Sequence, residues 1–216
     1  MHTRGLFLTV EGGEGVGKST NIAYLAEHLQ RHGVELVTTR EPGGTELAES
    51  IRELLLQVRD EPVADLTELL LIFAARAQHI NRVIEPALRQ GKWVLCDRFT
   101  DATYAYQCGG RDMSVPLVRQ LEQLVQGELR PDYTLLLDAP IATGMSRARE
   151  RGALDRFERE QQDFSQRVRD TYLQLAQESS GRYHVIDASL PLDEVQALVE
   201  NVCHELMECW GVRRKS

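Results

Sequence analysis

Short runs of apolar residues alternate along the chain with longer stretches in which apolar residues recur every three or four positions. The runs GLFLTVEG, VELVTT, KWVLCD, DYTLLLD and YHVIDA each predict a buried strand, and the first is expected to end at Gly12. The stretch GKSTNIAYLAEHLQRHG predicts a helix with one apolar face that ends at Gly33. Because strands and helices alternate, we predict a parallel sheet with right-handed crossovers.

The remaining helices follow from the same periodicity and from turn residues. EPGGT predicts a turn, with a helix starting at Thr45 and continuing through ELAESIRELLL. A longer helix is expected from about Leu66 to Arg89, bent or split near Pro86. The last helix is expected from about Leu192 to Trp210. We find no internal repeat and no linker, so we predict one α/β domain over residues 1–216: a five-stranded parallel sheet flanked by helices, with a small arginine-rich lid at about residues 145–158.

Composition narrows the possible partners. Hydrophobic residues make up 42% of the 216 residues, enough for a sizeable core, and the formal net charge of −8 argues against nucleic acid as a partner. Four cysteines without a C-x-x-C pair predict free thiols in a reducing cytosol, and therefore a cytoplasmic protein. The N-terminus does not resemble a signal peptide, and no apolar run approaches the ~18 residues that cross a membrane, so no membrane partner is expected.

The strongest chemical signal is VEGGEGVGKST at residues 10–20, which follows a predicted strand and opens a predicted helix. Its glycines let backbone N–H groups point at phosphate oxygens, Lys18 supplies a mobile cation, and Ser19 supplies a hydroxyl ligand for Mg²⁺. The loop therefore predicts a nucleoside triphosphate site. The residues expected to contact the triphosphate are Gly12, Gly13, Glu14, Gly15, Val16, Gly17, Lys18, Ser19 and Thr20.

A second signal is VLCDRF, in which Asp97 ends a predicted strand and Arg98 follows. A carboxylate at the carboxyl end of a parallel strand lies beside the nucleotide crevice, where Asp97 can bind Mg²⁺ through water. Arg98 faces the same crevice and can grip a phosphate with its planar guanidinium. An ordinary surface ion pair at the end of a strand is the alternative interpretation.

Two further patterns are ambiguous without context. SRARERGALDRFERE places Arg147, Arg149, Arg151 and Arg156 within ten positions, which is typical of a solvated helix face; Gly152 instead favours a mobile segment that closes over a transferring phosphoryl group. IFAARAQH places an aromatic ring and a guanidinium, Phe73 and Arg76, on one helical face, which could bind a flat base. A core phenylalanine beside a surface arginine is the alternative.

Five segments in this order, EGGEGVGKST, TREPGGT, FAARAQ, DRFTDATYAYQ and RARERGALDRFE, resemble the bacterial thymidylate kinase family from about Leu6 to Leu190. The resemblance implies a P-loop kinase fold that transfers the γ-phosphoryl of ATP to dTMP with Mg²⁺, giving dTDP and ADP for dTTP synthesis, usually as a homodimer.

The resemblance also implies roles for individual residues. Glu14 would accept a hydrogen bond from the 3′-hydroxyl of dTMP, and its charge can be offset by Lys18. Some members of the family carry a catalytic arginine at the position of Gly15, so here the charge is expected from the lid, with Arg151 first and Arg149 or Arg147 next. The full catalytic set is Lys18, Arg98, Arg151, Arg149 and Arg147, and the metal would lie at Ser19 and Asp97.

The acceptor nucleotide would be held by a set of residues implied in the same way. Arg40 and Arg98 would hold its phosphate, Phe73 would stack on thymine and Arg76 would bind the carbonyl edge, with Thr103 and Gln107 reading the rest of the base. Two positions depart from the family pattern. Many members have the stacking aromatic where this chain has Ile72, and Cys108 replaces a glycine of YQGGGR, where it could tighten the loop or place a thiol near the pocket.

Three alternatives share parts of this pattern. A kinase for dUMP or another nucleoside monophosphate would have the same donor half, because the thymine methyl offers only ~1–3 kcal/mol of discrimination. A deoxynucleoside kinase would have less need for both Arg40 and Arg98. A phosphate-loop switch protein would bind nucleotide without an acceptor pocket and would have no reason to bind dTMP.

Overall fold

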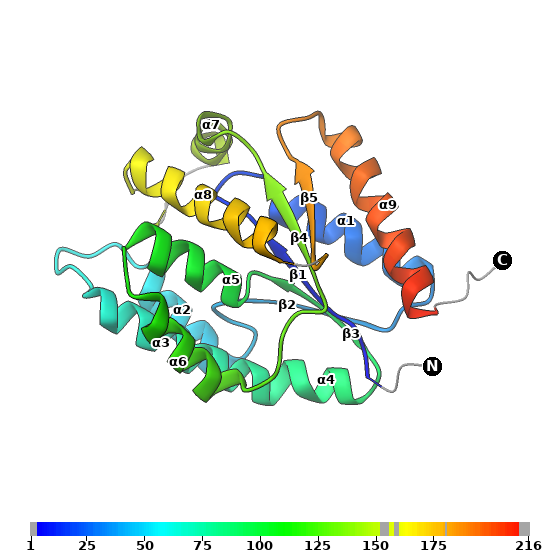
Figure 1. Cartoon of the computed structure of the whole chain (residues 1–216), viewed down its shortest axis with the longest axis horizontal. Helices are drawn as coiled ribbons and strands as arrows, with labels where there is room; N and C mark the ends of the chain where they lie inside the picture. Colours follow the sequence, from blue (N-terminus) through cyan, green and yellow to red (C-terminus); the bar gives the residue numbers. More distant parts are fainter. Residues whose placement is uncertain (1–3, 152–155, 158–159, 180, 212–216) are drawn as a thin grey trace.

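A parallel five-stranded sheet forms the centre of the molecule (Figure 1). The computed structural model describes residues 4–151, 156–157, 160–179 and 181–211. The strands have the order β2-β3-β1-β4-β5, and every neighbouring pair is parallel. The predicted fold class is thereby confirmed. The strands are β1 (Phe7–Glu11), β2 (Leu36–Arg40), β3 (Trp93–Asp97), β4 (Tyr133–Asp138) and β5 (Tyr183–Asp187).

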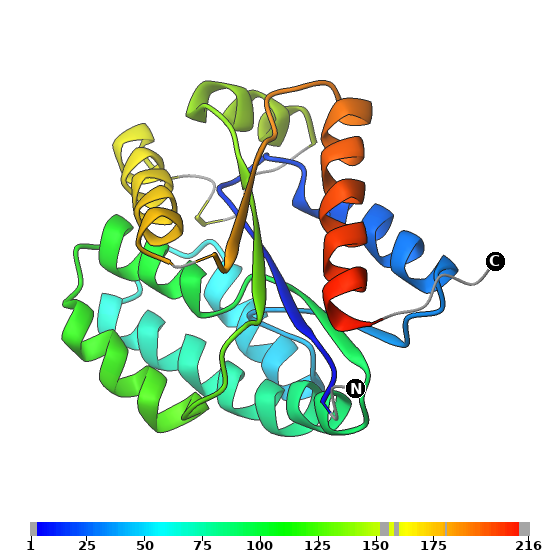
Figure 2. The ribbon, with the colours of Figure 1, turned by 45° about the vertical axis from the view of Figure 1, so that its right-hand side comes forward.

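Helices cover both faces of this sheet (Figures 1 and 2). One core cluster joins the sheet to α1 and α9, and others join it to the helices of the opposite face and to α8. Because both faces are covered, all five residues of β1 are buried. The helices are α1 (Lys18–Arg31), α2 (Glu46–Leu56), α3 (Asp65–His79), α4 (Glu85–Arg89), α5 (Thr100–Thr103), α6 (Val115–Gln126), α7 (Ile141–Arg151), α8 (Gln162–Glu178) and α9 (Leu192–Trp210), with two π-helical segments, η1 (Ile80–Ile84) and η2 (Tyr104–Gly110).

Local signals account for the start of α2 and the end of α1. The backbone N–H of Ala48 donates to the Thr45 side chain at 3.2 Å, so Thr45 caps α2 as expected. Gly33 has a φ of 82°, a left-handed conformation that suits the end of α1. The predicted long helix begins at Asp65 and is interrupted by η1, immediately before Pro86 in the first turn of α4. A proline ring clashes with the carbonyl four residues earlier, and the wider π-helical turn avoids that clash.

The strand order places the active region. β1 lies between β3 and β4, so the chain changes direction across the sheet at β1. Ligands of open α/β sheets bind beyond the carboxyl ends of the strands at such a switch point. The phosphate loop after β1 and Asp97 at the end of β3 both lie at this edge. Among the described helices, none combines the length and apolar character that a membrane span requires.

Candidate active site

A cavity of about 620 Å³ lies beyond the carboxyl ends of the sheet's strands. One side of it is the phosphate loop and the first turn of α1, and the other is formed by α2, α3, α5 and η2. Phe157 lines it from the segment after α7. The cavity thus joins the predicted triphosphate site to the residues expected to bind the acceptor. Of the expected residues, it is lined by Glu14, Gly15, Val16, Gly17, Lys18, Ser19, Thr20, Arg76, Asp97, Arg98, Thr103, Gln107 and Arg147.

The phosphate loop packs its backbone directly against α7. A Cβ added to Gly15 would lie 1.9 Å from the carbonyl oxygen of Gly144, and one added to Gly144 would lie 2.4 Å from the carbonyl oxygen of Glu14. Gly15 also has a φ of 68°, which disfavours other residues. An arginine at this position therefore has no room, and any catalytic arginine must come from elsewhere.

Lys18 lies at the floor of the loop. Its Nζ donates to the carbonyl oxygens of Gly12 at 3.1 Å and Gly13 at 2.7 Å, and the residue is 9% exposed. Burial lowers the pKa of Lys18, and the neighbouring Arg98 lowers it further. A bound triphosphate would add negative charge beside this buried ammonium.

Arg98 holds Glu14 at the centre of the cavity. Arg98 has a φ of 66°, and its Nη2 lies 2.7 Å from Oε1 of Glu14. The Tyr106 hydroxyl donates to the same carboxylate oxygen at 2.6 Å, and Arg98 Nη1 donates to the carbonyl oxygen of Gly12 at 2.8 Å. The loop carboxylate is therefore oriented by two partners that the sequence analysis did not connect to it.

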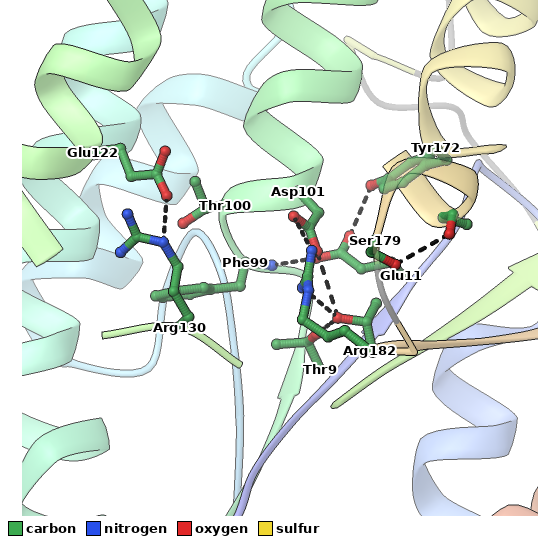
Figure 3. Close-up of polar contacts among 12 residues, drawn as sticks. Thr9, Glu11, Phe99, Thr100, Asp101, Glu122, Arg130, Tyr172, Ser179 and Arg182 are labelled. Atoms are coloured by element: carbon green, nitrogen blue, oxygen red, sulfur yellow. Dashed lines mark hydrogen bonds and ion pairs between the residues drawn. The ribbon is translucent and has the colours of Figure 1, made fainter. Parts of the chain in front are cut away.

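A buried polar network around Glu11 contacts Arg98 through Tyr172, and Figure 3 shows Glu11 with its partners Phe99 and Tyr172. Glu11 is fully buried; it accepts from the Phe99 N–H at 2.7 Å and from the Tyr172 hydroxyl at 2.8 Å. Arg98 Nη1 donates to the same hydroxyl at 3.1 Å. Burial raises the pKa of Glu11 to about 7, and Asp101 adds to the rise. This network fixes the strained turn after β3 without exposing a charge to the cavity.

Arg76 forms the deepest polar wall of the cavity. It is 2% exposed, its Nε donates to Glu41 at 2.7 Å, and its Nη2 donates to Thr103 at 3.0 Å. His79 Nδ1 lies 2.9 Å from the other oxygen of Glu41. Nη1 of Arg76 is buried and has no hydrogen-bond partner among the described residues. An unsatisfied buried N–H group in a cavity wall is a binding point for a ligand carbonyl.

The apolar wall beside Arg76 differs from expectation. Ile72 lines the cavity, whereas Phe73 is 2% exposed and packs with Leu69 and Val118. The Arg76 guanidinium stacks on the Phe73 ring, with Cζ of Arg76 4.9 Å from the ring centroid. Although both positions share a helical face with Arg76, the rotation of α3 turns Ile72 to the cavity and Phe73 to the core. The geometry therefore does not support stacking of Phe73 on a base.

The cations at the phosphate end also differ from expectation. Arg40 is paired with Glu49 at 2.8 Å, its side chain is 53% exposed, and it does not line the cavity. Arg52, which the sequence analysis missed, lines the cavity and donates to the carbonyl oxygen of Pro42 at 3.0 Å. Burial lowers the pKa of Arg52, and the charges of Arg40 and Arg98 lower it further. A site where guanidiniums repel one another is suited to an anion.

Asp97 and Ser19 meet the chemical requirements of a magnesium site. Both line the cavity, and Oδ1 of Asp97 is buried without a hydrogen-bond partner among the described residues. Carboxylate and hydroxyl oxygens are the ligands that Mg²⁺ uses, together with water and substrate phosphates. These residues therefore fit the ion that the phosphate loop predicts.

The arginine-rich segment divides into several parts. Arg147 lines the cavity and donates to the carbonyl oxygen of Ala188 at 2.7 Å, whereas Arg149 lines a separate hollow on the other side of α7. Position 151 ends α7, but the Arg151 side chain and Gly152 lie outside the described residues. Arg156 donates to the carbonyl oxygen of Leu55 at 2.9 Å and forms an ion pair with Glu68. This segment thus reaches across to α2 and α3.

The cysteines are free, as expected. Cys108 lies in η2 and packs against the cluster of Leu69, Phe73 and Val118, without lining the cavity. Burial raises the pKa of Cys108 to about 11. It is therefore a packing residue and is not a reactive thiol at the site.

A phosphate loop, an aspartate suited to a metal ion and several arginines line one cavity, as in a P-loop nucleoside monophosphate kinase. Comparison with known proteins gives the family. The sequence model for thymidylate kinase matches residues 10–199. The thymidylate kinase of Ectopseudomonas mendocina is 59% identical, over 96% of this chain and 99% of its own length, and that of Pseudomonas savastanoi pv. phaseolicola is 57% identical, over 94% and 97%. The crystal structure of thymidylate kinase from Ehrlichia chaffeensis superposes with a TM-score of 0.75 at 35% identity, covering 93% of this chain and 99% of that one. The chain belongs to the thymidylate kinase family.

Proposed function

We propose that the chain transfers the γ-phosphoryl group of ATP to dTMP, giving dTDP and ADP for dTTP synthesis, and that the cavity described above carries out the whole reaction. The assignment to residues rests on Arg76, which lines the same cavity as the phosphate loop and whose buried Nη1 has no hydrogen-bond partner among the described residues. One pocket then holds a donor triphosphate and an acceptor base at its two ends. Phosphoryl transfer depends mainly on such positioning and on charge stabilisation.

The base is proposed to bind against α3 and η2. Arg76 Nη1 donates to the O4 carbonyl of thymine, the Gln107 side chain can accept the N3–H, and Thr103 holds the guanidinium in place. Cytosine would present an amino group to the Arg76 cation and leave that N–H unsatisfied, so we expect it to be rejected strongly. The methyl group of thymine is proposed to contact Ile72, and such a contact excludes dUMP only about 10–200-fold.

The donor end is proposed to use the phosphate loop, Lys18 and Arg98. Ser19 and Asp97 would hold Mg²⁺, which would supply positive charge to offset that of the donor phosphates. Lys18 would leave the carbonyls of Gly12 and Gly13 for a phosphate oxygen. Glu14, oriented by Arg98 and Tyr106, is proposed to accept a hydrogen bond from the 3′-hydroxyl group of the acceptor sugar. This contact would set the distance between the two substrates.

The acceptor phosphate is proposed to lie between Arg98 and Arg52. Arg52→Ala should weaken equilibrium dTMP binding about 10–150-fold, because it removes a charge-assisted hydrogen bond worth about 1.5–3 kcal/mol. Arg40→Ala is the matched control, since Arg40 carries the same charge but is paired with Glu49 outside the cavity, and it should change binding less than about threefold. Binding is measured by calorimetry without ATP. If Arg40→Ala weakened dTMP binding more than Arg52→Ala, Arg40 rather than Arg52 would be the residue that holds the acceptor phosphate.

The catalytic cation is proposed to come from α7, because Gly15 leaves no room for one in the loop. Positions 147 and 151 lie one turn apart on one face of α7, and Arg147 already lines the cavity. Arg151→Ala should lower kcat about 10³-fold with little change in KM, as expected for a charge that acts in the transition state. Arg149→Ala should have little effect, because Arg149 faces a different hollow. The reverse ranking would remove Arg151 from the mechanism.

A homodimer and a cytoplasmic location complete the proposal. Exposed large apolar side chains are found on α2, α3 and α6, which pack side by side; they are Leu47, Leu54, Leu66, Leu70, Val115 and Leu124. A second copy of the chain is proposed to cover this face. Sedimentation analysis of the chain and of Leu70→Glu tests this, since only the former should sediment as a dimer. The free thiols support a reducing compartment.

A further inference from the structure

Three histidines meet where α1 packs against α9, on the face of the sheet that these two helices cover (Figures 1 and 2). His28 lies in the last turn of α1, His32 is the C-cap residue of that helix, and His204 projects from α9. The ring centroid of His28 lies 4.4 Å from the ring centroid of His32 and 5.2 Å from that of His204. At ~1.5 Å per residue, His28 is about 15 Å along α1 from Lys18, so this cluster is separate from the kinase site.

The ring nitrogens are arranged as ligands. One nitrogen from each histidine lies within 4.8 Å of the other two. His32 Nδ1 donates to the carbonyl oxygen of His28 at 2.9 Å, so its Nε2 keeps a free lone pair. Nε2 of His28, a residue only 6% exposed, is buried without a hydrogen-bond partner among the described residues. A buried imidazole nitrogen in this condition lacks either a donor or a metal ion.

A carboxylate lies beside one histidine of the cluster. Glu200 Oε1 lies 3.7 Å from Nδ1 of His28, and Glu200 Oε2 accepts from the Tyr24 hydroxyl at 2.9 Å. A carboxylate behind a metal-binding histidine orients the ring and raises its basicity.

We propose that His28, His32 and His204 form a binding site for a divalent transition-metal ion, Zn²⁺ above all, with Glu200 supporting His28 and a fourth position open to water. Three imidazole ligands suit Zn²⁺, Ni²⁺ and Cu²⁺ and do not suit Mg²⁺, so the magnesium that the kinase reaction uses would not fill the site. Tetrahedral bonds of about 2.0–2.1 Å require nitrogens about 3.3 Å apart, so metal binding would rotate the partly buried rings of His32 and His204 toward His28. The ion would join the end of α1 to α9.

The experiment uses the full, tag-free, nucleotide-free chain. Zn²⁺ is titrated in competition with a chromophoric chelator, and Co²⁺ is added separately as a spectroscopic probe. We expect one equivalent of each ion, visible Co²⁺ bands typical of tetrahedral nitrogen ligation without a thiolate charge-transfer band, and a higher unfolding midpoint with Zn²⁺. His32→Gln and His204→Gln should each weaken binding at least about 100-fold, since a ligand matters at least as much as its outer-shell partners.

Matched controls separate this site from other sources of binding. His184→Gln removes a histidine of β5 outside the cluster, Cys209→Ser removes the exposed thiol of α9, and Asp97→Asn removes the carboxylate of the kinase cavity. None of the three should change the affinity for Zn²⁺. The proposal is overturned if the unaltered chain binds less than one equivalent, or if binding survives in His32→Gln and His204→Gln. His28→Gln is not needed, so the test does not depend on a variant with a buried substitution.

Discussion

Lys18→Ala is expected to lower kcat for dTMP phosphorylation by about 10²–10³-fold, the effect of removing a preorganised charge-stabilising donor from a buried site. Its Nζ lies 3.1 Å from the carbonyl oxygen of Gly12 and 2.7 Å from that of Gly13, within reach of any phosphate held by the loop. Steady-state ADP formation measures the effect. Affinity for dTMP without ATP should stay within about twofold, because Arg76 and Arg52 are untouched.

Stability separates this chemical effect from damage to the fold. Burial lowers the pKa of Lys18, which means that the folded protein holds this ammonium at a cost. Lys18→Ala should therefore unfold at an equal or higher urea concentration than the parent chain. Lys92→Ala is the matched control, since Lys92 lies just before β3, at the opposite edge of the sheet, and it should leave kcat unchanged. A Lys18→Ala protein with near-normal turnover would show that Lys18 is not part of the transfer step.

Arg76→Met is expected to lower the free energy of unfolding by about 3–5 kcal/mol. The substitution leaves the buried carboxylate of Glu41 without one of its two ion-pair partners, Arg76 and His79. The side chains of Arg76 and Glu41 are 2% and 4% exposed, and Nε of Arg76 lies 2.7 Å from Oε2 of Glu41. The same substitution removes the N–H proposed to bind thymine, so dTMP affinity should fall at least about tenfold. Urea unfolding and calorimetry measure the two effects.

A double variant separates the two consequences of losing Arg76. Arg76→Met with Glu41→Gln should recover most of the stability, since no buried charge is left unpaired, but should not recover dTMP binding. If the double variant also regained normal dTMP affinity, Arg76 would not contact the base.

The pH dependence of stability gives an independent check. Burial would raise the pKa of Glu41, but Arg76 and His79 outweigh it and lower that pKa. The stability that Glu41 contributes is therefore present above its unfolded pKa of about 4.5 and is lost as the pH falls through the lower folded value. The double variant should lack this loss in acid.

The fold could be predicted because its signals are local. The five apolar runs correspond to β1–β5, and strand–helix alternation is enough to predict a parallel sheet. The phosphate loop, Asp97 and Arg98 were also found, since they directly follow strands whose carboxyl ends meet at one edge. The interruption at η1 was placed slightly late, because Pro86 marks the end of the distortion and the backbone adjusts before it.

The acceptor wall could not be predicted residue by residue. Ile72 and Phe73 are adjacent on α3, and only the packing of α3 against α6 decides which of them faces the cavity. The proposal that Arg52 rather than Arg40 holds the acceptor phosphate rests on the ion pair between Arg40 and Glu49. The sequence offered one signal for Arg52: it lies 12 positions after Arg40, about one turn before the end of a predicted helix.

Partners that act across the sheet were missed for a related reason. Glu41, Tyr106 and Tyr172 hold Arg76, Glu14 and Glu11 through contacts between segments 35, 92 and 161 residues apart. Sequence spacing does not encode such pairs, because they arise only after the sheet has brought the segments together.

The most direct test of the central claim is the rate of ADP formation with ATP and Mg²⁺ and, in turn, dTMP, dUMP, dCMP, dAMP and thymidine. The account predicts turnover with dTMP, with dUMP about 10–200-fold lower in kcat/KM for want of the methyl group. The other three should be lower still, dCMP and dAMP because they mismatch Arg76 and thymidine because it lacks the phosphate that Arg52 and Arg98 are proposed to hold. Equal or better turnover with dCMP, dAMP or thymidine, or no dTMP-dependent turnover from folded protein, would contradict it.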